Sequence, residues 1–586
     1  MPGFVGICSK ALDVSNESVE DAVKETVYSS NTSIKDIHAD NNLILKKSFI
    51  NFLELPRMNA QRDGVQVWID GEIYNQEELR KEPQETFAET LLSCYLQDNL
   101  ESLLKKVDGI YIAVIYDLRK QQLQMITDRY GLKVFYLYAK NNCLILAPEL
   151  KCFSHLKPFI LQIRQDVVDC FIRLEHLMGN ATWFDGVEVT VPSTIYNYSW
   201  KDNTLTKKRY WSWGTIQRSS ITLETASEEL ASLLDKAIKS RKFGNYRVGV
   251  GLSGGFDSRA ILASIRHDKP ITYTFGIEES EDVRLAKKVA GVAGVKNVHF
   301  DMRIDNWLPK RFSGVWKTDG MLNMYHMHYS HLMDEIPKIM DVNLSGFLGD
   351  GVLGSTYLTK KGKTFLNKRI DHTTAQHYYG EYYKFSDPND SFFDIPKVDA
   401  YLFYNRGRRL TGLGMEEANK TIYQRLPFMD NKLLDFSYSL PDEFRENSIL
   451  YHRALLMKYP KFYKDIPHAT SGVPISINPS LVHKSKKLYH RGLWIAKYKL
   501  GMATSFMDVN NWVKEPETAN LIREMLNPKH ALYPNFTKTN FLEVYVEPHI
   551  NGKSTHAKQV MSALTMEIWL QQIFNKKYLS ASSENK

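Results

Sequence analysis

Short runs of β-forming residues, separated by turn residues, dominate the first 212 positions of the chain. Four such runs predict strands, each bounded by Asp, Gly, Asn or Lys: Val67–Tyr74, Ile110–Tyr116, Leu123–Thr127 and Leu144–Leu146. The segment from Thr86 to Gln97 predicts a helix among them. The pattern is that of an α/β domain over residues 1–212, and the polar stretch Gly214–Thr222 has the composition of a linker.

The periodicity changes at Leu223, where apolar residues recur at helical spacing as far as about Lys239. Strand and helix patterns then alternate, with a strand over Ile271–Phe275 and a helix over Glu281–Ala293. Such alternation predicts a parallel sheet. Residues beyond about 395 are predicted to be mostly helical. We therefore expect an α/β chain with domains at 1–212 and 223–575, followed by a polar tail at 576–586.

Composition places the chain among ordinary large globular proteins. Its 586 residues are 43% hydrophobic, which is enough for sizeable cores. A net charge of +8, from 75 basic and 67 acidic residues, does not by itself predict nucleic-acid binding. The five cysteines lie in the first third without CxxC spacing, which favours reduced thiols over disulfides or zinc ligands. The N-terminus lacks signal-peptide features and no stretch approaches about 18 uninterrupted apolar residues, so we expect a cytoplasmic protein without a membrane span.

A Ser-Gly-Gly-x-Asp-Ser turn at residues 253–258 is the most informative motif. It follows a valine-bearing predicted strand and precedes a predicted helix over Arg259–Ile265. Two adjacent glycines let the backbone approach an anion, and two serines can donate hydrogen bonds beside the helix N–H groups; these residues are Ser253, Gly254, Gly255 and Ser258. Asp257 would repel phosphate unless a divalent cation bridges them, so the motif predicts a Mg²⁺–nucleotide site.

A second glycine-rich acidic motif, Leu344–Gly354, follows another apolar strand pattern. Its glycines, Gly346 among them, allow a tight turn that can aim Asp350 at the same cation as Asp257. Two carboxylates beside the Ser-Gly-Gly turn would complete a site for Mg²⁺ and pyrophosphate. The predicted metal ligands are therefore Asp257 and Asp350.

These motifs resemble those of the asparagine synthetase family. The Ser-Gly-Gly turn is similar to its pyrophosphate-binding loop, Asp350 matches the aspartate of its second metal-binding motif, and Gln424–Asp430 is similar to a Glu-x-Arg-x-Pro-Phe-Leu-Asp segment near its substrate. Four segments of the first domain resemble the family's glutaminase domain: Asp70–Asn75, Val107–Asp117, Thr127–Gly131 and Ala147–Lys151. The resemblance extends over most of residues 1–475.

The resemblance implies both a fold and a reaction. The fold is an N-terminal Ntn-hydrolase-like αββα sandwich followed by a Rossmann-like, nucleotide-binding synthetase domain with a parallel sheet. In the family, a carboxylate attacks the α-phosphorus of ATP, pyrophosphate leaves, and nitrogen captures the acyl-adenylate. ATP and Mg²⁺ are the implied cofactors. By the same resemblance, backbone around Gly276 would hold adenine beside an apolar wall from Leu252, and Arg425 matches the arginine of the substrate segment.

The first domain lacks the residue on which glutamine hydrolysis depends in that family. The catalytic residue there is an N-terminal cysteine whose own α-amino group acts as base, and Pro2 stands in its place here. Cys8 lies beyond the first strand and is interpreted as a small buried hydrophobe. Asp70–Gly71 replaces the family's usual Asn-Gly pair, and no Arg-rich segment is recognisable between Leu43 and Met58. We therefore expect a retained scaffold that does not hydrolyse glutamine, as in β-lactam synthetases, carbapenam synthetases and lasso peptide cyclases.

Two departures from the family pattern fall in the synthetase domain. Tyr423 occupies the place of a glutamate that serves as acid–base partner in lactam-forming members. A phenol with a reference pKa of about 10 keeps its proton near neutral pH, so Tyr423 needs an unusual environment to act as a base. Thr470, or a neighbour, stands where the family has a lysine that steadies the transition state. Both changes concern the amide-forming step and leave the adenylation motifs intact.

The combined pattern predicts an ATP-dependent, AMP-forming amide ligase that does not use glutamine. Its partners would be a carboxylate substrate, whether a small molecule, a peptide or a glycan precursor, and an amine or ammonia; a second copy of the chain is a further candidate. Alternatives within this class are lasso-type macrolactam cyclisation, amidation of a sugar acid or polysaccharide, and ammonia-dependent asparagine synthesis. A non-catalytic nucleotide-binding regulator is the alternative from another class. An enzyme that activates tRNA or cofactors would share only the pyrophosphate loop.

Three further clusters admit more than one interpretation. Asp319 with Tyr325 and His326 could line an acceptor pocket or belong to the core. The arginines within 406–409 could bind an anionic substrate or lie on a solvated helix face. The amphipathic basic helix predicted over 484–499 could bind an acidic polymer, a peptide or a membrane surface, or be a solvated face.

Overall fold

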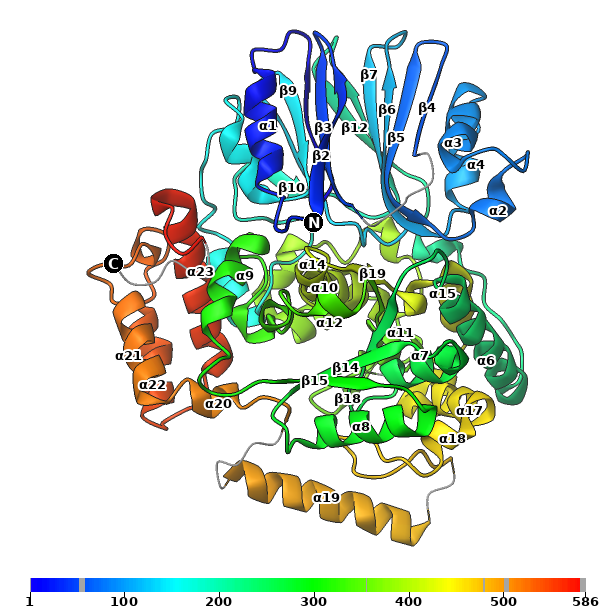
Figure 1. The fold of residues 1–586 in the computed structure, drawn as a ribbon, viewed down its shortest axis with the longest axis vertical. Helices are drawn as coiled ribbons and strands as arrows, with labels where there is room; N and C mark the ends of the chain where they lie inside the picture. Colours follow the sequence, from blue (N-terminus) through cyan, green and yellow to red (C-terminus); the bar gives the residue numbers. More distant parts are fainter. Residues whose placement is uncertain (1, 52–57, 355, 478–479, 500–504, 580–586) are drawn as a thin grey trace. The chain divides into compact units, whose positions relative to one another are not determined.

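The chain forms two compact units in the computed structural model, which describes residues 2–51, 58–354, 356–477, 480–499 and 505–579 (Figure 1). Unit 1 comprises Met1–Thr215, Ile370–Ile395 and Tyr404–Thr421, and unit 2 comprises Ile216–Arg369, Pro396–Phe403 and Ile422–Lys586. The predicted domain bounds at 1–212 and 223–575 stay predictions. Most of the predicted tail at 576–586 lies outside the described residues.

Unit 1 is built on two antiparallel six-stranded sheets, with strand orders β10-β8-β9-β1-β3-β2 and β12-β11-β7-β6-β5-β4. The first sheet contains β1 Phe4–Ser9, β2 Thr32–Ala39, β3 Leu43–Ile50, β8 Tyr136–Lys140, β9 Cys143–Ala147 and β10 Val187–Val189. The second contains β4 Asn59–Arg62, β5 Val65–Ile73, β6 Gly109–Asp117, β7 Gln122–Thr127, β11 Thr194–Ser199 and β12 Thr204–Arg209. Because successive side chains of a strand point to opposite faces, each sheet can turn one apolar face toward the other.

A single apolar core joins these two sheets, with Cys8, Leu45, Ile112 and Leu123 among its buried members. The helices of unit 1 are α1 Asn16–Lys24, α2 Gln76–Leu79, α3 Phe87–Leu96, α4 Leu100–Leu104, α5 Val168–Leu174, α12 His372–Tyr379 and α14 Gly412–Ala418. Helix α1 packs on β1 and β3, whereas α3 packs on β4 and β5. This helix–sheet–sheet–helix order confirms the predicted αββα sandwich.

Unit 2 contains a five-stranded parallel sheet with the order β15-β14-β13-β16-β19. Its strands are β13 Val248–Gly251, β14 Ile271–Gly276, β15 Asn297–Asp301, β16 Val342–Leu344 and β19 Tyr423–Arg425. The chain adds β14 and β15 on one side of β13, then returns to add β16 and β19 on the other side. A reversal of this kind leaves a crevice at the carboxyl ends of the two strands where it occurs, here β13 and β16. The predicted parallel sheet is thus confirmed.

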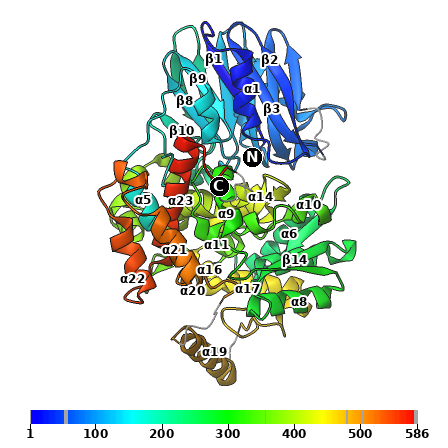
Figure 2. The ribbon, with the colours of Figure 1, turned by 60° about the vertical axis from the view of Figure 1, so that its left-hand side comes forward.

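The helices of unit 2 cover this sheet and extend beyond it (Figure 2). They are α6 Leu223–Ser240, α7 Asp257–Ile265, α8 Glu281–Ala293, α9 Pro309–Lys317, α10 Ile336–Ile339, α11 Gly349–Leu353, α13 Val398–Leu402, α15 Asn431–Ser439, α16 Asp442–Arg445, α17 Ile449–Lys458, α18 Pro460–Tyr463, α19 Leu481–Lys499, α20 Val509–Trp512, α21 Pro516–Met525, α22 Glu547–Ile550 and α23 Ala557–Asn575. A short hairpin is formed by β17 Thr359–Lys360 and β18 Lys363–Thr364. Helix α7 packs on β13, and α8 packs on β14 and β15. Within the described residues, no helix has both the length and the apolar character that crossing a bilayer requires.

Helix α7 begins two residues earlier than the sequence pattern predicts. It starts at Asp257, where a start at Arg259 was expected, because Phe256 already has helical backbone angles. Asp257 and Ser258 therefore lie in the first helical turn, where backbone N–H groups have no partner within the helix.

Candidate functional site

The Ser-Gly-Gly turn joins β13 to α7 at the carboxyl edge of the parallel sheet. Ser258 Oγ accepts from the Ser253 N–H at 3.3 Å, and Ser253 Oγ accepts from the Gly255 N–H at 3.2 Å. Asp282, in the first turn of α8, accepts from the Gly254 N–H at 3.1 Å. Each serine hydroxyl accepts in these contacts and can still donate its own proton to an anion. The turn therefore has the hydrogen-bonding capacity that its sequence predicted for a phosphate cradle.

Asp257 and Asp350 lie beside each other at the point where the strand order reverses. The backbone N–H of Asp350 donates to Asp257 Oδ2 at 3.0 Å, and the Tyr451 hydroxyl on α17 donates to Asp257 Oδ1 at 2.8 Å. The Thr356 hydroxyl donates to Asp350 Oδ2 at 2.7 Å. Both carboxylates are thus oriented by hydrogen bonds, and the structure brings the predicted pair together.

Glycines of the second motif make this close approach possible. A Cβ atom on Gly349 would lie 2.5 Å from Asp257 Cγ, and one on Gly346 would lie 3.1 Å from Asp257 Cβ. Leu348, immediately before α11, has a φ of 56°, a left-handed conformation that costs a residue with a side chain about 1 kcal/mol or more. The turn is therefore strained and tightly packed where it delivers Asp350 to Asp257.

The carboxyl group of Asp257 is costly to ionise at this position. Burial, and then the negative charge of Asp350, raise its pKa to about 7. A divalent cation between the two carboxylates would relieve this cost. The donors available are oxygens only, and Mg²⁺ is commonly held by one or two carboxylates together with substrate phosphates. The residues present therefore fit the predicted cation.

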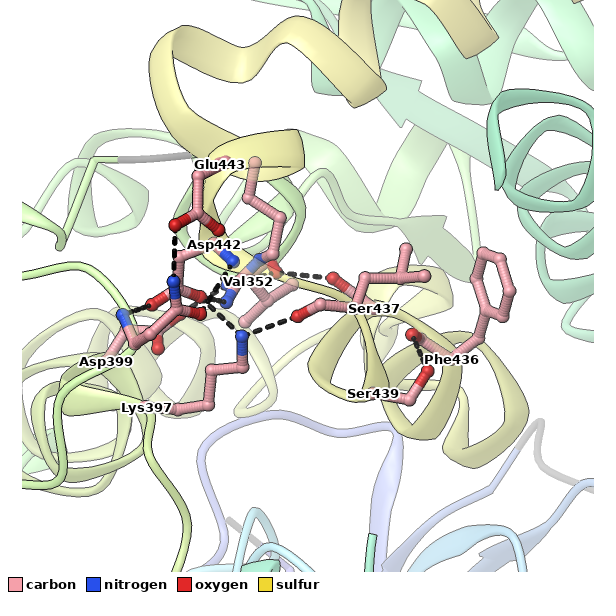
Figure 3. A network of polar contacts seen from close by, with 11 residues as sticks. Val352, Lys397, Asp399, Phe436, Ser437, Ser439, Asp442 and Glu443 are labelled. Atoms are coloured by element: carbon pink, nitrogen blue, oxygen red, sulfur yellow. Dashed lines mark hydrogen bonds and ion pairs between the residues drawn. The ribbon is translucent and has the colours of Figure 1, made fainter. Parts of the chain in front are cut away.

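A buried ion network holds α11, the helix that carries the second carboxylate (Figure 3). Arg445 donates to the carbonyl of Val352 on α11 at 2.8 Å and also pairs with Asp399. Lys397 pairs with Asp442 at an N···O distance of 2.6 Å, and Arg445 lies 3.4 Å from the same carboxylate. Two cations and two carboxylates balance one another, which makes their burial tolerable. The network fixes the backbone of α11 from the side away from its first turn.

A cavity of about 930 Å³ opens over the two carboxylates. Predicted residues that line it are Ser253, Gly255, Asp257, Ser258, Gly346 and Asp350. Another wall comes from the start of α17, where Asn447 and Ser448 both have positive φ, 52° and 59°. The N-termini of α7 and α17 therefore both meet this cavity, and each contributes the partial positive charge of a helix start.

Helix α19 brings two lysines to the same cavity. Lys484 and Lys487 both line it. His490, one turn further along α19, packs so closely on the backbone of residue 472 that a Cβ atom on Gly472 would lie 2.1 Å from His490 Cδ2. This contact fixes the face of α19 that carries the lysines toward the cavity. Among the described residues that line the cavity, these two are the only lysines.

His452 on α17 is held neutral near this positive charge. Burial is the largest cause, and the neighbouring His468 and Lys487 add to it; together they lower the pKa of the His452 imidazole to about 4. His468 also lines the cavity, and burial lowers the pKa of its ring as well. Near neutral pH both rings are therefore uncharged and can accept as well as donate hydrogen bonds.

Arg259 ties the Ser-Gly-Gly turn to the loop after α18. Its guanidinium group is buried and donates to four backbone carbonyls, those of Gly254, Phe462, Ile466 and Pro467, at 2.9–3.3 Å. It also lies over the rings of Phe256 and Tyr463. This arginine follows the motif directly and shapes the cavity wall without lining the cavity.

Five predicted residues are not among the described lining of the cavity: Leu252, Gly254, Gly276, Tyr423 and Arg425. The Arg425 guanidinium instead donates to the carbonyls of Arg241 and Phe243, at 2.9 Å and 2.8 Å, and lies 3.9 Å from the Phe243 ring centroid. Tyr423 is buried in β19. These contacts pack Arg425 against α6 and the segment after it, and its catalytic role stays a prediction.

The strand end predicted to hold adenine is covered by another segment of unit 2. The Ile277 N–H donates to the Phe506 carbonyl at 2.9 Å. A Cβ atom on Gly276 would lie 2.7 Å from that same oxygen. The backbone edge at 275–277 therefore contacts protein in this structure, and its role in base recognition stays a prediction.

Two arginines of segment 406–409 have a structural role. This finding corrects both interpretations given above, an anion-binding site and a solvated helix face. Arg408 and Arg409 are buried in unit 1 and donate to carbonyls of the same unit, those of Gly179, Ala181 and Thr190. They are neither an anion site nor a solvated face. Asp319, Tyr325 and His326 do not line the cavity of unit 2 either.

Two protein-family models match separate parts of the chain. The family described as "Glutamine amidotransferase domain" matches residues 3–211, and the family described as "Asparagine synthase" matches residues 229–390. The chain belongs to the asparagine synthetase family. It is accordingly an ATP-dependent carbon–nitrogen ligase.

Curated relatives in this family are distant. A probable glutamine-hydrolysing asparagine synthetase of Acanthamoeba polyphaga mimivirus is 24% identical over 419 residues, covering 66% of this chain and 69% of that protein. The Gallus gallus asparagine synthetase is 24% identical over 409 residues, covering 65% and 66%. The alignments thus span about two thirds of these relatives. A solved structure of glutamine phosphoribosylpyrophosphate amidotransferase from B. subtilis matches with a TM-score of 0.24 at 10% identity, covering 50% of this chain and 65% of that one, which is too low to carry an argument.

Asp70 of unit 1, which stands at a position where the sequence departs from the family pattern, is held by two lysines. Lys47 and Lys133 lie 2.9 Å and 2.7 Å from its carboxylate oxygens. Burial opposes the charged form of Asp70, but Lys133 and Lys47 outweigh it and lower the pKa of the carboxyl group. A Cβ atom on Gly3 would lie 3.2 Å from the same carboxylate. A buried ion cluster therefore lies beside Gly3, just before the start of β1.

Cys8 is not a substitute nucleophile. Its side chain belongs to the core between the two sheets, and burial raises the pKa of the thiol far above its usual value. A thiol reacts as its thiolate, so this environment makes Cys8 inert. The interpretation of Cys8 as a buried hydrophobe is confirmed.

Several residues that line the cavity were not predicted from the sequence, notably Tyr451, His452, Lys484 and Lys487. The signal for the lysines was the basic amphipathic pattern of 484–499, which gave no indication of what the helix faces. Thr470, at the position of the family lysine, does not line the cavity, although His468 and Ser471 on either side of it do.

Proposed function

We propose that the chain uses Mg²⁺ and ATP to adenylate a substrate carboxylate, releases pyrophosphate, and joins the acyl group to an amine or ammonia in the cytoplasm. One observation carries the proposal: Asp257 and Asp350 meet at the switch point of the sheet, beside an anion-binding turn. Paired carboxylates next to a phosphate cradle suit metal-bound phosphates and would repel bare ones.

Each part of the cavity has a role in this reaction. The Ser253 and Ser258 hydroxyls and the start of α7 would bind the pyrophosphate portion of ATP, and Lys484 and Lys487 would face it with positive charge. Asp257 and Asp350 would hold Mg²⁺, which when bound offsets charge on the leaving pyrophosphate. No enzyme nucleophile is required, because the substrate carboxylate itself attacks and the cavity mainly supplies position and electrostatics.

The cavity also has room for the second half of the reaction. At about 930 Å³ it lies at the upper end of ligand pockets, which run from about 300 to about 1,000 Å³. His452 and His468 line it as neutral rings, so each can accept a hydrogen bond from an incoming amine and orient it. Tyr423 is buried in β19 and is not among the described residues that line the cavity.

We further propose that the nitrogen does not come from glutamine. Pro2 offers no side-chain nucleophile, Cys8 is buried in the core, and Asp70 is held by two lysines beside the start of β1. The amine is therefore either part of a second substrate or free ammonia. Lasso-type cyclisation, sugar-acid amidation and ammonia-dependent asparagine synthesis all satisfy this requirement.

Exchange of labelled pyrophosphate into ATP, screened over pools of carboxylic acids, tests the adenylation step. We expect carboxylate-dependent exchange that falls about a hundredfold or more in Asp257→Asn and in Asp350→Asn. Asp268→Asn is the matched control, since Asp268 is a surface carboxylate of unit 2 paired with Lys242. Magnesium-dependent ATP binding without exchange for any acid would contradict the ligase proposal and support a nucleotide-binding regulator.

The nitrogen source is tested once an acid is found. Amide formation should proceed with ammonium or an amine, and glutamine alone should give neither amide nor glutamate. Release of glutamate from glutamine would contradict the proposed loss of glutaminase activity while leaving adenylation untouched.

A further inference from the structure

Helix α19 presents large apolar side chains to solvent. Among the described residues, four of the five most exposed large hydrophobic side chains lie on this one helix: Leu481 at 84%, Tyr489 at 73%, Leu488 at 71% and Val482 at 63% exposed. Ile495 is also exposed. Isolated exposed hydrophobes are ordinary, but a cluster of this density marks a surface that contacts something apolar.

These side chains share one side of the helix. At about 100° per residue, positions 481, 488 and 495 fall close together, and 482 and 489 lie next to them. Small residues fill the arc between the two rows: Ser485, Gly492 and Ala496. We call this surface the apolar arc of α19. It is continuous from one end of the described side chains to the other.

The opposite side of α19 is fixed toward the body of unit 2. Lys487 lines the cavity and His490 packs on Gly472, and both lie across the helix from the apolar arc; Lys484, which also lines the cavity, lies beside the arc. The apolar arc must therefore face outward, and both ribbon views show α19 at the outside of this unit (Figures 1 and 2).

Charge around the apolar arc is of one sign. No Asp or Glu occurs between Asp465 and Asp508, a stretch that includes all of α19. Lys486 borders the arc on one side and Arg491 lies toward the other, and both are exposed. Apolar residues flanked by Lys and Arg are typical of helices that lie in the plane of an anionic bilayer, with cations at the level of the headgroups. A second copy of α19 would instead place like charges against each other.

We propose that α19 binds the surface of anionic membranes, with its apolar arc in the headgroup region and Lys486 and Arg491 against anionic lipid. Unit 2 would then be a peripheral membrane protein held by one interfacial helix. This binding rests only on α19 and is independent of the chemistry proposed for the cavity.

Flotation of the full-length protein with lipid vesicles tests the proposal. We expect co-flotation with vesicles of phosphatidylcholine and phosphatidylserine, weak binding to phosphatidylcholine alone, and release by high salt. Replacing both Leu481 and Leu488 by Glu should reduce binding about tenfold or more, because it removes apolar burial and adds negative charge. Both side chains are exposed, so the variant should keep its melting temperature.

Ile160→Glu is the matched control, since Ile160 is 69% exposed in unit 1 and far from α19 in sequence. It should float as the unmodified protein does. The proposal is overturned if the unmodified protein stays unbound, or if the double variant binds as well as the control. It is also overturned if light scattering shows a dimer that the double variant dissociates while vesicles capture neither form.

Discussion

At the scale of single residues, the site is governed by what surrounds the Asp257 carboxylate. Its two oxygens accept from Tyr451 and from the backbone of Asp350, and its pKa is raised to about 7. Tyr451 keeps its proton in this contact, because burial and then the charge of Asp257 raise the pKa of the phenol well above its usual value. Asp257 is therefore oriented but only partly ionised near neutral pH.

Magnesium-dependent ATP binding should consequently depend on pH. Because the folded-state pKa of Asp257 lies near 7, the carboxylate form that a cation needs is depleted below that pH and complete above it. We expect affinity to rise up to about tenfold per pH unit below pH 7 and to level off above it, as measured by calorimetry from about pH 5.5 to about pH 8.5. Asp350→Asn should weaken binding overall and move the midpoint lower, since it removes a neighbouring negative charge. A flat profile in the unmodified protein would contradict this account.

Lys487 gives a second residue-scale prediction. It lines the cavity, so Lys487→Ala should raise the KM for ATP by about tenfold through loss of one charge interaction with the phosphates. Lys487→Arg should retain most of the affinity. Lys486→Ala is the matched control, because its neighbour Lys486 is not among the described lining residues. Equal effects of the two alanine substitutions on steady-state kinetics would show that Lys487 acts only through overall charge.

At the scale of elements, the short helix α11 holds Asp350 in a fixed position. The ion network of Arg445, Lys397, Asp399 and Asp442 holds its far end, and glycines let its near end touch Asp257. Two strands with short connections thereby place two carboxylates beside each other without a flexible segment between them. Precise placement of this kind is what adenylation needs, because the substrate supplies the nucleophile.

Gly349→Ala should disturb the packing of α11 against Asp257. The added Cβ atom would lie 2.5 Å from Asp257 Cγ, so either α11 or the start of α7 has to move. We expect a loss of about 1–3 kcal/mol in the free energy of unfolding, together with weaker magnesium-dependent ATP binding. Gly291→Ala is the control, since a Cβ atom there meets nothing within 4 Å and a helical alanine should stabilise α8. Unchanged stability and binding in Gly349→Ala would show that the approach seen here is not required.

Local patterns were sufficient to predict several elements of the two units. Helix α8 coincides with the predicted Glu281–Ala293, and β14 extends the predicted Ile271–Phe275 by one residue. Helix α3 matches the predicted Thr86–Gln97 because Thr86 and Glu89 form a capping box that fixes its start. These features depend on residues within one or two turns of each other, which is the range that a sequence pattern reports.

Long-range contacts were beyond the same patterns. The site acquires Tyr451 from α17 and two lysines from α19, whose positions depend on packing between segments about two hundred residues apart in the chain. Arg425 shows the converse: its motif is recognisable, yet its side chain turns toward Arg241 and Phe243. A motif specifies the residue types, whereas the direction of a side chain depends on neighbours that come from elsewhere in the sequence.

At the scale of the whole molecule, unit 1 is completed by segments that follow much of unit 2 in the sequence. Lys420 pairs with the buried Glu149, and Arg408 donates to the Thr190 carbonyl at 2.8 Å. Asn405 accepts from the Gly179 N–H at 2.9 Å. The αββα sandwich therefore depends for its buried polar groups on residues some two hundred positions beyond its last strand.

A fragment limited to residues 1–215 should consequently fold poorly. Removal of 370–395 and 404–421 leaves Glu149 short of one buried cation and strips buried carbonyls of their donors. Each unpaired polar group costs about 1–3 kcal/mol, and loss of a partner from a buried ion cluster about 3–5 kcal/mol, which together approach the whole stability of a domain. We expect the fragment to lack a cooperative thermal transition by circular dichroism.

A matched chimera, in which a long Gly-Ser linker joins residues 1–215 to 370–421, should recover that transition because it restores Lys420, Arg408 and Asn405. Equal cooperative melting of the fragment and the chimera would show that segments 370–395 and 404–421 pack on unit 1 but do not contribute to its stability.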